Sequence, residues 1–336
     1  MRSVEDTGSL INNMEEFIFR IHNAGMRIRQ SSYEKVGMME YCKDKTKKPE
    51  EPEENKTGFY IYCVMQEGAV INMDQKGIDG AGSLFPVQYR ELAAVVSEVE
   101  LDKFKLHTAS AGNEVDMGWI EEKARAHEKI VEQLMKENDL LPAKFCSIVS
   151  SKEGLKAFLA DNYHEYARAF QRLKGHEEWN VKAYLDFEKL KQFVTDNTPE
   201  IRERREMLSF MSETSKYLMK RKIDNLIHER TDKRYEAVIV YIAKALRAVS
   251  ECEAFSKPEP PKHQQTQTPI VFKASYLIKK TKLQSFNQQL NELSDNLEPE
   301  GVSFEITGPW PPYTFVKDEE KENAERSLIR LLLPLK

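Results

Sequence analysis

The stretch from residue 119 to residue 186 changes its hydrophobic period three times, and this constrains the fold more than any other feature of the chain. Two parts place apolar or small residues on one face at steps of three and four, as amphipathic helices do. Pro142 breaks the first helix, and Gly175 is suited to end the second. The last part alternates apolar and polar side chains, as a strand with one buried face does. The expected elements are a helix over 120–134, a strand over 143–149, a helix over 155–173 and a strand over 179–185.

Length and charge set the outer limits. A chain of 336 residues is expected to hold two domains. The net charge is −5, so no broad attraction to nucleic acid or to anionic lipid is expected. No apolar run approaches the roughly 20 residues that span a bilayer, which favours a cytoplasmic protein without a membrane partner. Cysteines without CxxC spacing indicate buried thiols in a reducing compartment; they are Cys42, Cys63, Cys146 and Cys252.

The N-terminal region precedes the folded body. Residues 1–42 form an extension whose first part has the apolar spacing of an amphipathic helix, which either docks on a partner or packs on its own protein. Acidic residues interrupt it, so it is not a signal peptide. Residues 43–57 are almost entirely charged or proline and predict a flexible linker. The folded body is therefore expected to begin at Gly58.

The first domain is expected to span residues 58–186. Residues 59–65 are apolar on both faces, as in a central strand, and residues 92–97 supply another strand. The glycine-rich residues 77–82 resemble a phosphate loop, but an extended segment follows them, so a turn between strands is favoured. Together with the two helices, these strands predict an α+β domain of ferredoxin-like type, an antiparallel sheet with helices on one face.

The second domain is expected to be a smaller α+β unit with long helices. Residues 187–256 carry an apolar stripe, with a helix start at Thr198-Pro199. Residues 257–268 indicate a loop, and residues 269–336 a β-α-β unit with a tail. The prolines of 308–313 predict that the chain leaves the sheet there, either as a rigid tail packed on the domain through Trp310 and Tyr313 or as an aromatic docking surface. The expected elements of this unit are strands over 270–278 and 302–306, a helix over 283–297, and a final helix that includes residues 328–333.

Catalytic motifs are absent from the sequence. Four His-Glu neighbours look like acid/base pairs, but adjacent residues on a helix point about 100° apart. His127 lies on an apolar stripe and is predicted to be a hydrogen-bonded core residue. No catalytic residue, cofactor or metal site is expected. The basic run Lys220-Arg221-Lys222 is interpreted as a solvated helix face, with contact to an acidic partner as the alternative.

Six segments, taken in order, resemble the GvpL/GvpF family of gas vesicle proteins over about residues 58–317. They are FYIYCV at 59–64, YRELAAVVSEV at 89–99, ARAHEKIVEQLM at 124–135, LPAKFCSIV at 141–149, EEWNVKAYLD at 177–186 and GPWPPYTFV at 308–316. The family usually has a basic residue followed by Phe-Gly-Thr where this chain has Lys144-Phe145-Cys146-Ser147. A side chain at Cys146 puts a close backbone approach there in doubt.

The resemblance implies a non-enzymatic accessory protein for gas vesicle assembly. It would bind the small hydrophobic shell subunit, and other accessory proteins, in a chaperone-like or scaffolding role, at gas vesicles or their assembly intermediates. Charged and aromatic residues within the matching segments are the candidate partner-binding residues. They are Arg90, Arg125, Lys144, Phe145, Trp179, Trp310 and Tyr313.

Two other classes of function stay open from sequence. A ferredoxin-like sheet can stack single-stranded RNA on exposed aromatic residues, here Tyr60 and Tyr62, although the net charge and the absence of an RNA-binding signature argue against it. Similar α+β domains also enclose small ligands or act as enzymes. No convergent set of titratable residues supports that alternative.

Overall fold

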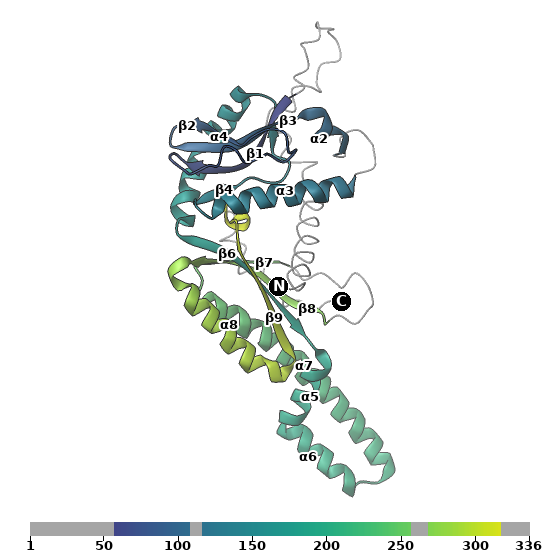
Figure 1. Cartoon of the computed structure of the whole chain (residues 1–336). Coiled ribbons are helices and arrows are strands. Elements are labelled where there is room, and N and C mark those ends of the chain that lie inside the picture. The colour runs from purple at the N-terminus through teal and green to yellow at the C-terminus, as the bar shows by residue number, and fades with distance from the viewer. Residues whose placement is uncertain (1–56, 108–115, 257–267, 317–336) are drawn as a thin grey trace, which may run out of the picture. The chain divides into compact units, whose positions relative to one another are not determined.

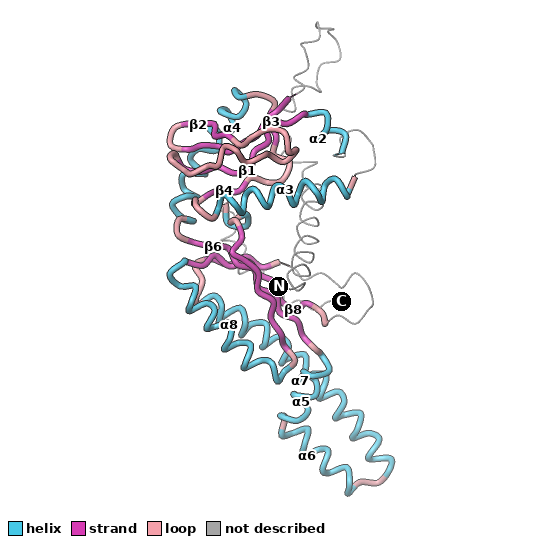
Figure 2. Tube along the Cα trace, in the orientation of Figure 1, coloured by secondary structure: helices cyan, strands magenta, loops and turns pink. Residues whose placement is uncertain are grey.

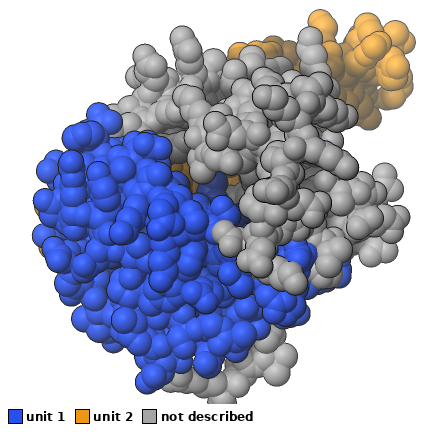
Figure 3. Space-filling model, turned by 90° about the horizontal axis from the view of Figure 1, so that it is seen from above, with its two compact units in different colours: residues 1–174 blue, residues 175–336 orange. Residues whose placement is uncertain are grey.

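The computed structural model describes residues 57–107, 116–256 and 268–316. They form two compact units, the first ending at Lys174 and the second beginning at Gly175; Figure 3 gives each its own colour. Both units are α+β with antiparallel sheets, as predicted (Figure 1). The predicted N-terminal helix, the charged linker except Thr57, the loop after Ser256 and the final helix lie outside the described residues. Of the cysteines within them, Cys63 is fully buried, and Cys146 and Cys252 are half-buried free thiols.

The first unit is built on an antiparallel sheet in the order β2-β3-β1-β4, with β5 also paired to β1. Read from β4, this is the order 4-1-3-2 of a ferredoxin-like sheet, with residues 67–84 connecting β1 to β2 where that fold has its first helix. The strands are β1 (Thr57–Gln66), β2 (Phe85–Tyr89), β3 (Leu92–Glu100), β4 (Leu140–Pro142) and β5 (Ile148–Val149). The helices are α2 (Leu101–His107), α3 (Met117–Met135) and α4 (Lys152–Leu173).

Helices cover both faces of this sheet. Tyr60 and Tyr62 share a core with Val131 and other residues of α3. Phe59 points to the opposite face, because neighbouring strand residues alternate, and there the Nζ atom of Lys152 in α4 lies 5.9 Å from its ring centroid. The expected antiparallel sheet with helices is present in this unit, with α3 on one face and α4 on the other. A central strand that is apolar on both faces needs cover on both.

A bulge in β1 interrupts the alternation of its side chains. The register against β3 shifts between Ile61 and Cys63, so Tyr62 is the extra residue. Beyond the bulge, Cys63 and Met65 join Tyr60 and Tyr62 in the same core. The shift places two consecutive side chains on one side of the strand.

The strand predicted over residues 143–149 is wrong for its first part. β4 ends at Pro142, residues 143–147 form a turn, and only Ile148 and Val149 return to pair with β1. Pro142 was interpreted as the break after the helix, but it lies opposite Cys63 at the end of a short strand. Proline is tolerated in a strand where its missing N–H is not needed by the ladder.

The second unit repeats the strand path, with the order β7-β8-β6-β9, which is 4-1-3-2 when read from β9. β6 was predicted as the last strand of the first domain; instead it is a central strand of the second sheet, and the division falls before it and not after Asp186. The strands are β6 (His176–Leu185), β7 (Cys252–Phe255), β8 (Ile270–Lys279) and β9 (Val302–Trp310). The helices are α5 (Phe187–Asn197), α6 (Pro199–Met207), α7 (Glu213–Arg247) and α8 (Leu283–Leu297).

Helices α7 and α8 pack on one face of the second sheet. Phe272 and Val181 of the sheet share a core with Ile242 of α7 and Phe286 of α8. The carboxylate of Asp186 caps the start of α5 by accepting from two backbone N–H groups. β7 lies within the region predicted to be helical; at four residues it is too short to show a period of its own.

Helices α5, α6 and the first half of α7 form an arm that extends beyond the end of the second sheet (Figures 1 and 2). Pro199 begins α6, as predicted. A small core of Val194, Ile201, Ile223 and Ile227 holds the arm together. The 3₁₀ turn η2 (Leu208–Phe210) follows α6, and Met211 and Ser212 then connect it to α7.

The strand β9 continues through Pro309 to Trp310, and the chain leaves the sheet at Pro311, within the segment where this was predicted. The Gly308-Pro309 peptide is cis, and the register shifts so that Trp310 pairs with Glu178. β9 is the last strand of the sheet path, where a proline costs no ladder bond on its outer side. The chain then enters the 3₁₀ turn η5 (Tyr313–Phe315).

Candidate partner-binding surfaces

A buried hydrogen-bonded network fixes the turn that carries Lys144 and Phe145. The hydroxyl of Tyr60 lies 3.1 Å from Nδ1 of His127 and accepts a bond of 3.0 Å from the backbone N–H of Cys146. In the neutral ring with Nδ1 unprotonated, the hydroxyl can donate its proton to Nδ1, and the ring also bonds the backbone of Ala143. Burial lowers the pKa of His127 to about 4, so its ring is neutral at pH 7. The prediction of a hydrogen-bonded core histidine is confirmed.

Tyr62 fixes the glycine-rich loop in a similar way. Its hydroxyl lies 2.7 Å from Oγ of Ser97 and accepts a 2.8 Å bond from the N–H of Ile78. A side chain at Gly77 would meet Ser97 at 2.4 Å, so only glycine fits there. A 2.7 Å bond from Gly77 N–H to the Gly82 carbonyl closes the loop as a turn between strands, as predicted.

The burial of these two tyrosines removes the RNA-binding alternative in the form considered from sequence. Tyr60 and Tyr62 have no exposed surface. Stacking of bases requires an accessible aromatic face. Their position on a central strand suggested a platform, but α3 covers that face.

Lys144 and Phe145 lie together on the anchored turn. Lys144 is exposed, and the half-buried ring of Phe145 lies 6.1 Å from the His127 ring. Cys146 has φ +61°, the left-handed conformation that favours glycine. The turn therefore has the backbone shape that the glycine of the family pattern would adopt. Burial of the thiol raises the pKa of Cys146 to about 12.

Arg90 occupies the two-residue turn between β2 and β3, with φ +53°. Its guanidinium carbon lies 5.5 Å from the centroid of the Tyr89 ring and 4.8 Å from that of Tyr163 in α4. The Tyr163 hydroxyl donates to the carboxylate of Glu91, which holds the tyrosine in place. Arg90 is thus an exposed cation in contact with two aromatic rings.

The four candidate residues of the first unit do not form one site. Arg90 follows β2, which ends the sheet path on one side, and Lys144 follows β4, which ends it on the other. Arg125 is exposed on α3 and bonded to Glu121 one turn earlier. Such a surface pair contributes little to stability. The structure brings together Lys144 and Phe145 alone.

The other three candidates belong to the second unit, although Trp179 was assigned to the first domain from sequence. Trp310 pairs across the sheet with Glu178, the neighbour of Trp179. The carboxylate of Glu178 is almost fully buried and accepts bonds of 3.0 Å and 2.6 Å from the N–H and hydroxyl of Thr314. Tyr313 lies beside Thr314 on the half-buried turn η5. Glu178 therefore fixes the segment that carries Trp310 and Tyr313.

Sequence reasoning missed several residues that shape these surfaces. Tyr163 lies on the apolar stripe of its helix, four residues after Leu159, where a polar hydroxyl could have indicated a partner. Glu178 is buried although the alternation places it on the same face as the polar residues Asn180 and Lys182, so the sequence pattern gave no signal of its burial. The exposed Phe210 gave no signal, because an apolar residue near a helix end is usually buried.

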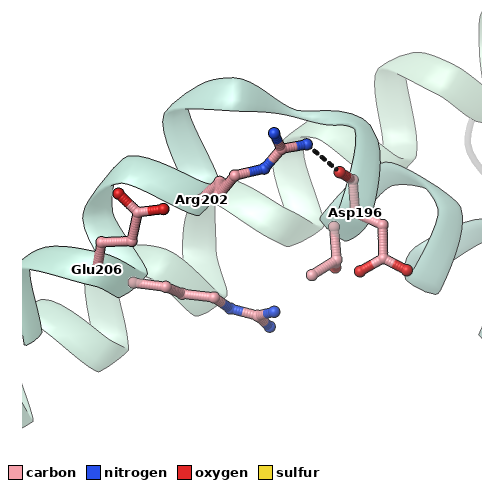
Figure 4. Close-up of a pocket in the computed structure, with 5 residues that line it drawn as sticks. Asp196, Arg202 and Glu206 are labelled. Carbon is pink, nitrogen blue, oxygen red and sulfur yellow. Dashed lines mark hydrogen bonds between the residues drawn. The ribbon is translucent and has the colours of Figure 1, made fainter.

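A pocket lies on the arm, at the junction of α5 and α6 (Figure 4). It has a volume of about 390 Å³ and is lined by Thr195, Asp196, Arg202, Arg205 and Glu206. Arg202 donates a 2.9 Å bond to the backbone carbonyl of Asp196. Four of the five residues that line this pocket are charged, whereas hydrophobic and aromatic residues predominate in small-molecule sites.

The described ranges contain neither a cluster of metal ligands nor a helix suited to span a membrane. Within residues 57–107, 116–256 and 268–316, no group of three or more His, Cys, Asp or Glu side chains is placed to hold a metal ion. Among the helices described, none is long and apolar enough to cross a bilayer.

These features define an α+β protein with two antiparallel sheets, in which five of the seven charged and aromatic candidates lie at turns or at a strand end. The sequence of residues 58–317 matches the family described as gas vesicle synthesis protein GvpL/GvpF, and the chain belongs to this family of gas vesicle accessory proteins. The match begins at β1 and ends just beyond η5, so it includes both units.

Known proteins of this kind resemble the chain along most of its length. Gas vesicle protein L of Streptomyces sp. is 26% identical, over 79% of this chain and 95% of that protein. Gas vesicle protein L1 of Halobacterium salinarum is 22% identical, over 78% and 91%. The crystal structure of GvpF from Anabaena sp. PCC7120 superposes with a TM-score of 0.56 at 20% identity, covering 78% of this chain and 98% of that one. GvpF from Microcystis aeruginosa gives a TM-score of 0.52 at 18% identity, with coverage of 77% and 99%.

Proposed function

We propose that this chain is a non-enzymatic accessory protein that binds the small hydrophobic gas vesicle shell subunit during assembly. The observation that carries the proposal is the family match, which spans both folded units. A partner that covers an apolar subunit lowers the free concentration available for aggregation. The role would be chaperone-like or scaffolding, with other gas vesicle accessory proteins as further partners.

The turn surfaces of the first unit support this proposal. Arg90 is restrained by contact with Tyr89 and Tyr163, and Lys144 lies on a turn anchored by buried Tyr60. A preorganised side chain loses little conformational freedom when a partner binds. Phe145, half-buried beside Lys144, adds apolar area for an apolar partner.

Binding is favoured over catalysis by the surroundings of the perturbed groups. Burial raises the pKa of Tyr62 to about 12 and lowers that of His127 to about 4. Both side chains are enclosed and bonded to structural partners, so neither is placed to exchange protons with a substrate. Their role in the proposal is to hold the loops that present surface residues.

The proposal is tested by co-expression of the full chain with the shell subunit and measurement of the amount retained on the purified chain. The variant Arg90→Glu/Lys144→Glu reverses one charge at each turn. The matched control, Lys156→Glu/Arg168→Glu, makes the same charge change at exposed positions of α4. We expect at least about tenfold less shell subunit on the turn variant and an unchanged amount on the control.

Two results would count against the proposal. Absence of shell subunit on the folded wild-type chain, with an unrelated apolar protein as reference, would overturn shell binding itself. Equal retention by the turn variant and the control would overturn the assignment of Arg90 and Lys144.

A further inference from the structure

The end of the helical arm exposes apolar side chains on both sides of the turn between α6 and α7. Phe210 is 91% exposed, Tyr217 67%, Leu218 56% and Met207 52%. All four lie within residues 207–218, at the end of the arm that points away from the second sheet (Figure 1). Exposed large apolar side chains that gather in this way indicate an interaction surface more often than scattered ones do.

The first turns of α7 have two opposite faces. Met219, Ile223 and Ile227 point into the small core of the arm. Helical geometry places Tyr217 and Leu218 about half a turn away from that face. The outer face is therefore part of an ordered helix, since its inner face is packed, and its exposure is a stable property of the arm.

Basic side chains surround this outer face. Arg221 lies one turn after Tyr217 and Leu218, with Lys220 and Lys222 on either side of it. Within the described part of the chain, these three exposed side chains form no salt bridge. Residues 199–222 contain seven basic and four acidic side chains, a net charge of +3, whereas the whole chain carries −5. The end of the arm is thus locally basic on an acidic protein.

We propose that the end of the arm, defined by Met207, Phe210, Tyr217, Leu218 and residues 220–222, docks an amphipathic helix of a partner protein that carries acidic side chains beside its apolar face. The four apolar side chains cover the apolar face of that helix, and the three basic ones pair with its acids. This pairing of apolar contact with opposite charge is a common mode of helix recognition. The surface belongs to the second unit, so it is independent of Arg90 and Lys144.

A protein helix fits the arm better than an anionic membrane does. The acidic side chains Glu200, Glu203, Glu206 and Glu213 alternate with the basic ones over the same residues. A lipid surface presents uniform negative charge and is repelled by each of them. A helix with acids at defined positions can meet Lys220, Arg221 and Lys222 and avoid the glutamates.

Two labelled peptides of about 18 residues, or five helical turns, test the proposal with the full chain. Both have the same leucine face; one carries glutamates beside it and the other carries glutamines. Fluorescence anisotropy gives the Kd for the wild type and for two arm variants, Lys220→Glu/Arg221→Glu/Lys222→Glu and Phe210→Ser/Leu218→Ser. Matched controls are Lys191→Glu/Lys244→Glu/Lys279→Glu for charge and Tyr241→Ser for an exposed aromatic.

We expect the glutamate peptide to bind the wild type at least about tenfold more tightly than the glutamine peptide, and each arm variant to lose that advantage while the controls keep it. Circular dichroism confirms that the variants stay folded. Failure of the glutamate peptide to bind, or equal binding by the arm variants, overturns the proposal. Anionic phosphatidylserine vesicles are the third probe, and arm-dependent binding to them without peptide binding would replace the helix with a membrane. The arm variants are also measured for retention of the shell subunit. This measurement distinguishes a failure of the arm proposal from a failure of the role proposed for Arg90 and Lys144.

Discussion

The hydroxyl of Tyr60 lies 3.1 Å from Nδ1 of His127, across 67 residues of sequence, and accepts the backbone N–H of Cys146 at the same time. One buried side chain thus joins the central strand, the helix above it and the turn of Lys144 and Phe145. Removing the hydroxyl leaves a buried donor and a buried acceptor unpaired, and each costs about 1–3 kcal/mol.

The variant Tyr60→Phe tests this relationship. We expect a loss of unfolding free energy of about 2–4 kcal/mol and faster hydrogen exchange at the Cys146 amide. The exposed Tyr217→Phe serves as the control and should change stability by less than about 0.5 kcal/mol. Unchanged exchange at Cys146 would show that the hydroxyl does not hold the turn.

Stability should depend on pH through His127. Burial lowers its pKa to about 4 in the folded chain, against about 6.5 when unfolded, so the unfolded chain binds the extra proton first as the pH falls. The stabilisation is fully present above pH 6.5 and decreases by about 3 kcal/mol as the pH falls to about 4. NMR titration of the His127 ring checks the folded value directly. A ring that titrates near pH 6.5 in the folded chain would contradict this prediction.

Substitutions at Cys146 should follow its backbone conformation. A β-branched residue is poorly accommodated at φ +61°, so Cys146→Val is expected to lower the unfolding free energy by at least about 2 kcal/mol. Cys146→Gly removes the strain but also the packing of the thiol, so its effect should stay within about 1 kcal/mol. Urea unfolding of both variants measures the order. Equal unfolding free energies of the valine and glycine variants would contradict this prediction.

Arg90 offers a substitution that separates binding from stability. In Arg90→Gly the turn gains a residue suited to φ +53°, which offsets the lost contacts with Tyr89 and Tyr163, each about 0.5–1 kcal/mol. We expect a melting temperature within a few degrees of the wild type and weaker retention of the shell subunit. Full retention would mean that the guanidinium is not part of the binding surface.

We expect the carboxylate of Glu178 to keep the segment after β9 ordered. Glu178→Ala leaves the N–H and hydroxyl of Thr314 without their shared acceptor, with an expected loss of about 2–3 kcal/mol and faster exchange at the Thr314 amide. Glu177→Ala is the control, because it removes a neighbouring carboxylate that accepts a 3.2 Å bond from the indole N–H of Trp179. The same exchange rate at Thr314 in both variants would argue against a specific role for Glu178.

Local patterns predicted most elements but not their partners. β1, α3, α4, β8 and α8 were found because their apolar residues keep one period over many positions. The turn at residues 143–147 was missed because its shape depends on a distant hydroxyl, that of Tyr60. β6 was recognised as a strand but placed in the wrong sheet, since alternation shows that one face is buried and not which helices bury it.

The candidate surfaces were harder to predict than the fold. Motif membership gave seven residues, and the structure distributes them over two units and brings only neighbours together. Exposure depends on what packs nearby, so the sequence near Phe210 did not distinguish a buried helix end from an exposed one. The basic run at Lys220 was noted, but its proximity to exposed Tyr217 and Leu218 required the faces of α7.

The strand path of the second sheet has a consequence for synthesis of the chain. β6 emerges from the ribosome well before its partner strands. Asn180 bonds Ser275 of β8, which is synthesised 95 residues later, and Lys182 bonds Glu305 of β9, which is synthesised 123 residues later. Until then both edges of this strand lack their neighbours, and Val181, Ala183 and Leu185 lack the helix α8 that will cover them. The first unit, by contrast, has all its strands by Val149. A nascent accessory protein of this family thus carries, for much of its own translation, the kind of uncovered apolar segment that invites aggregation.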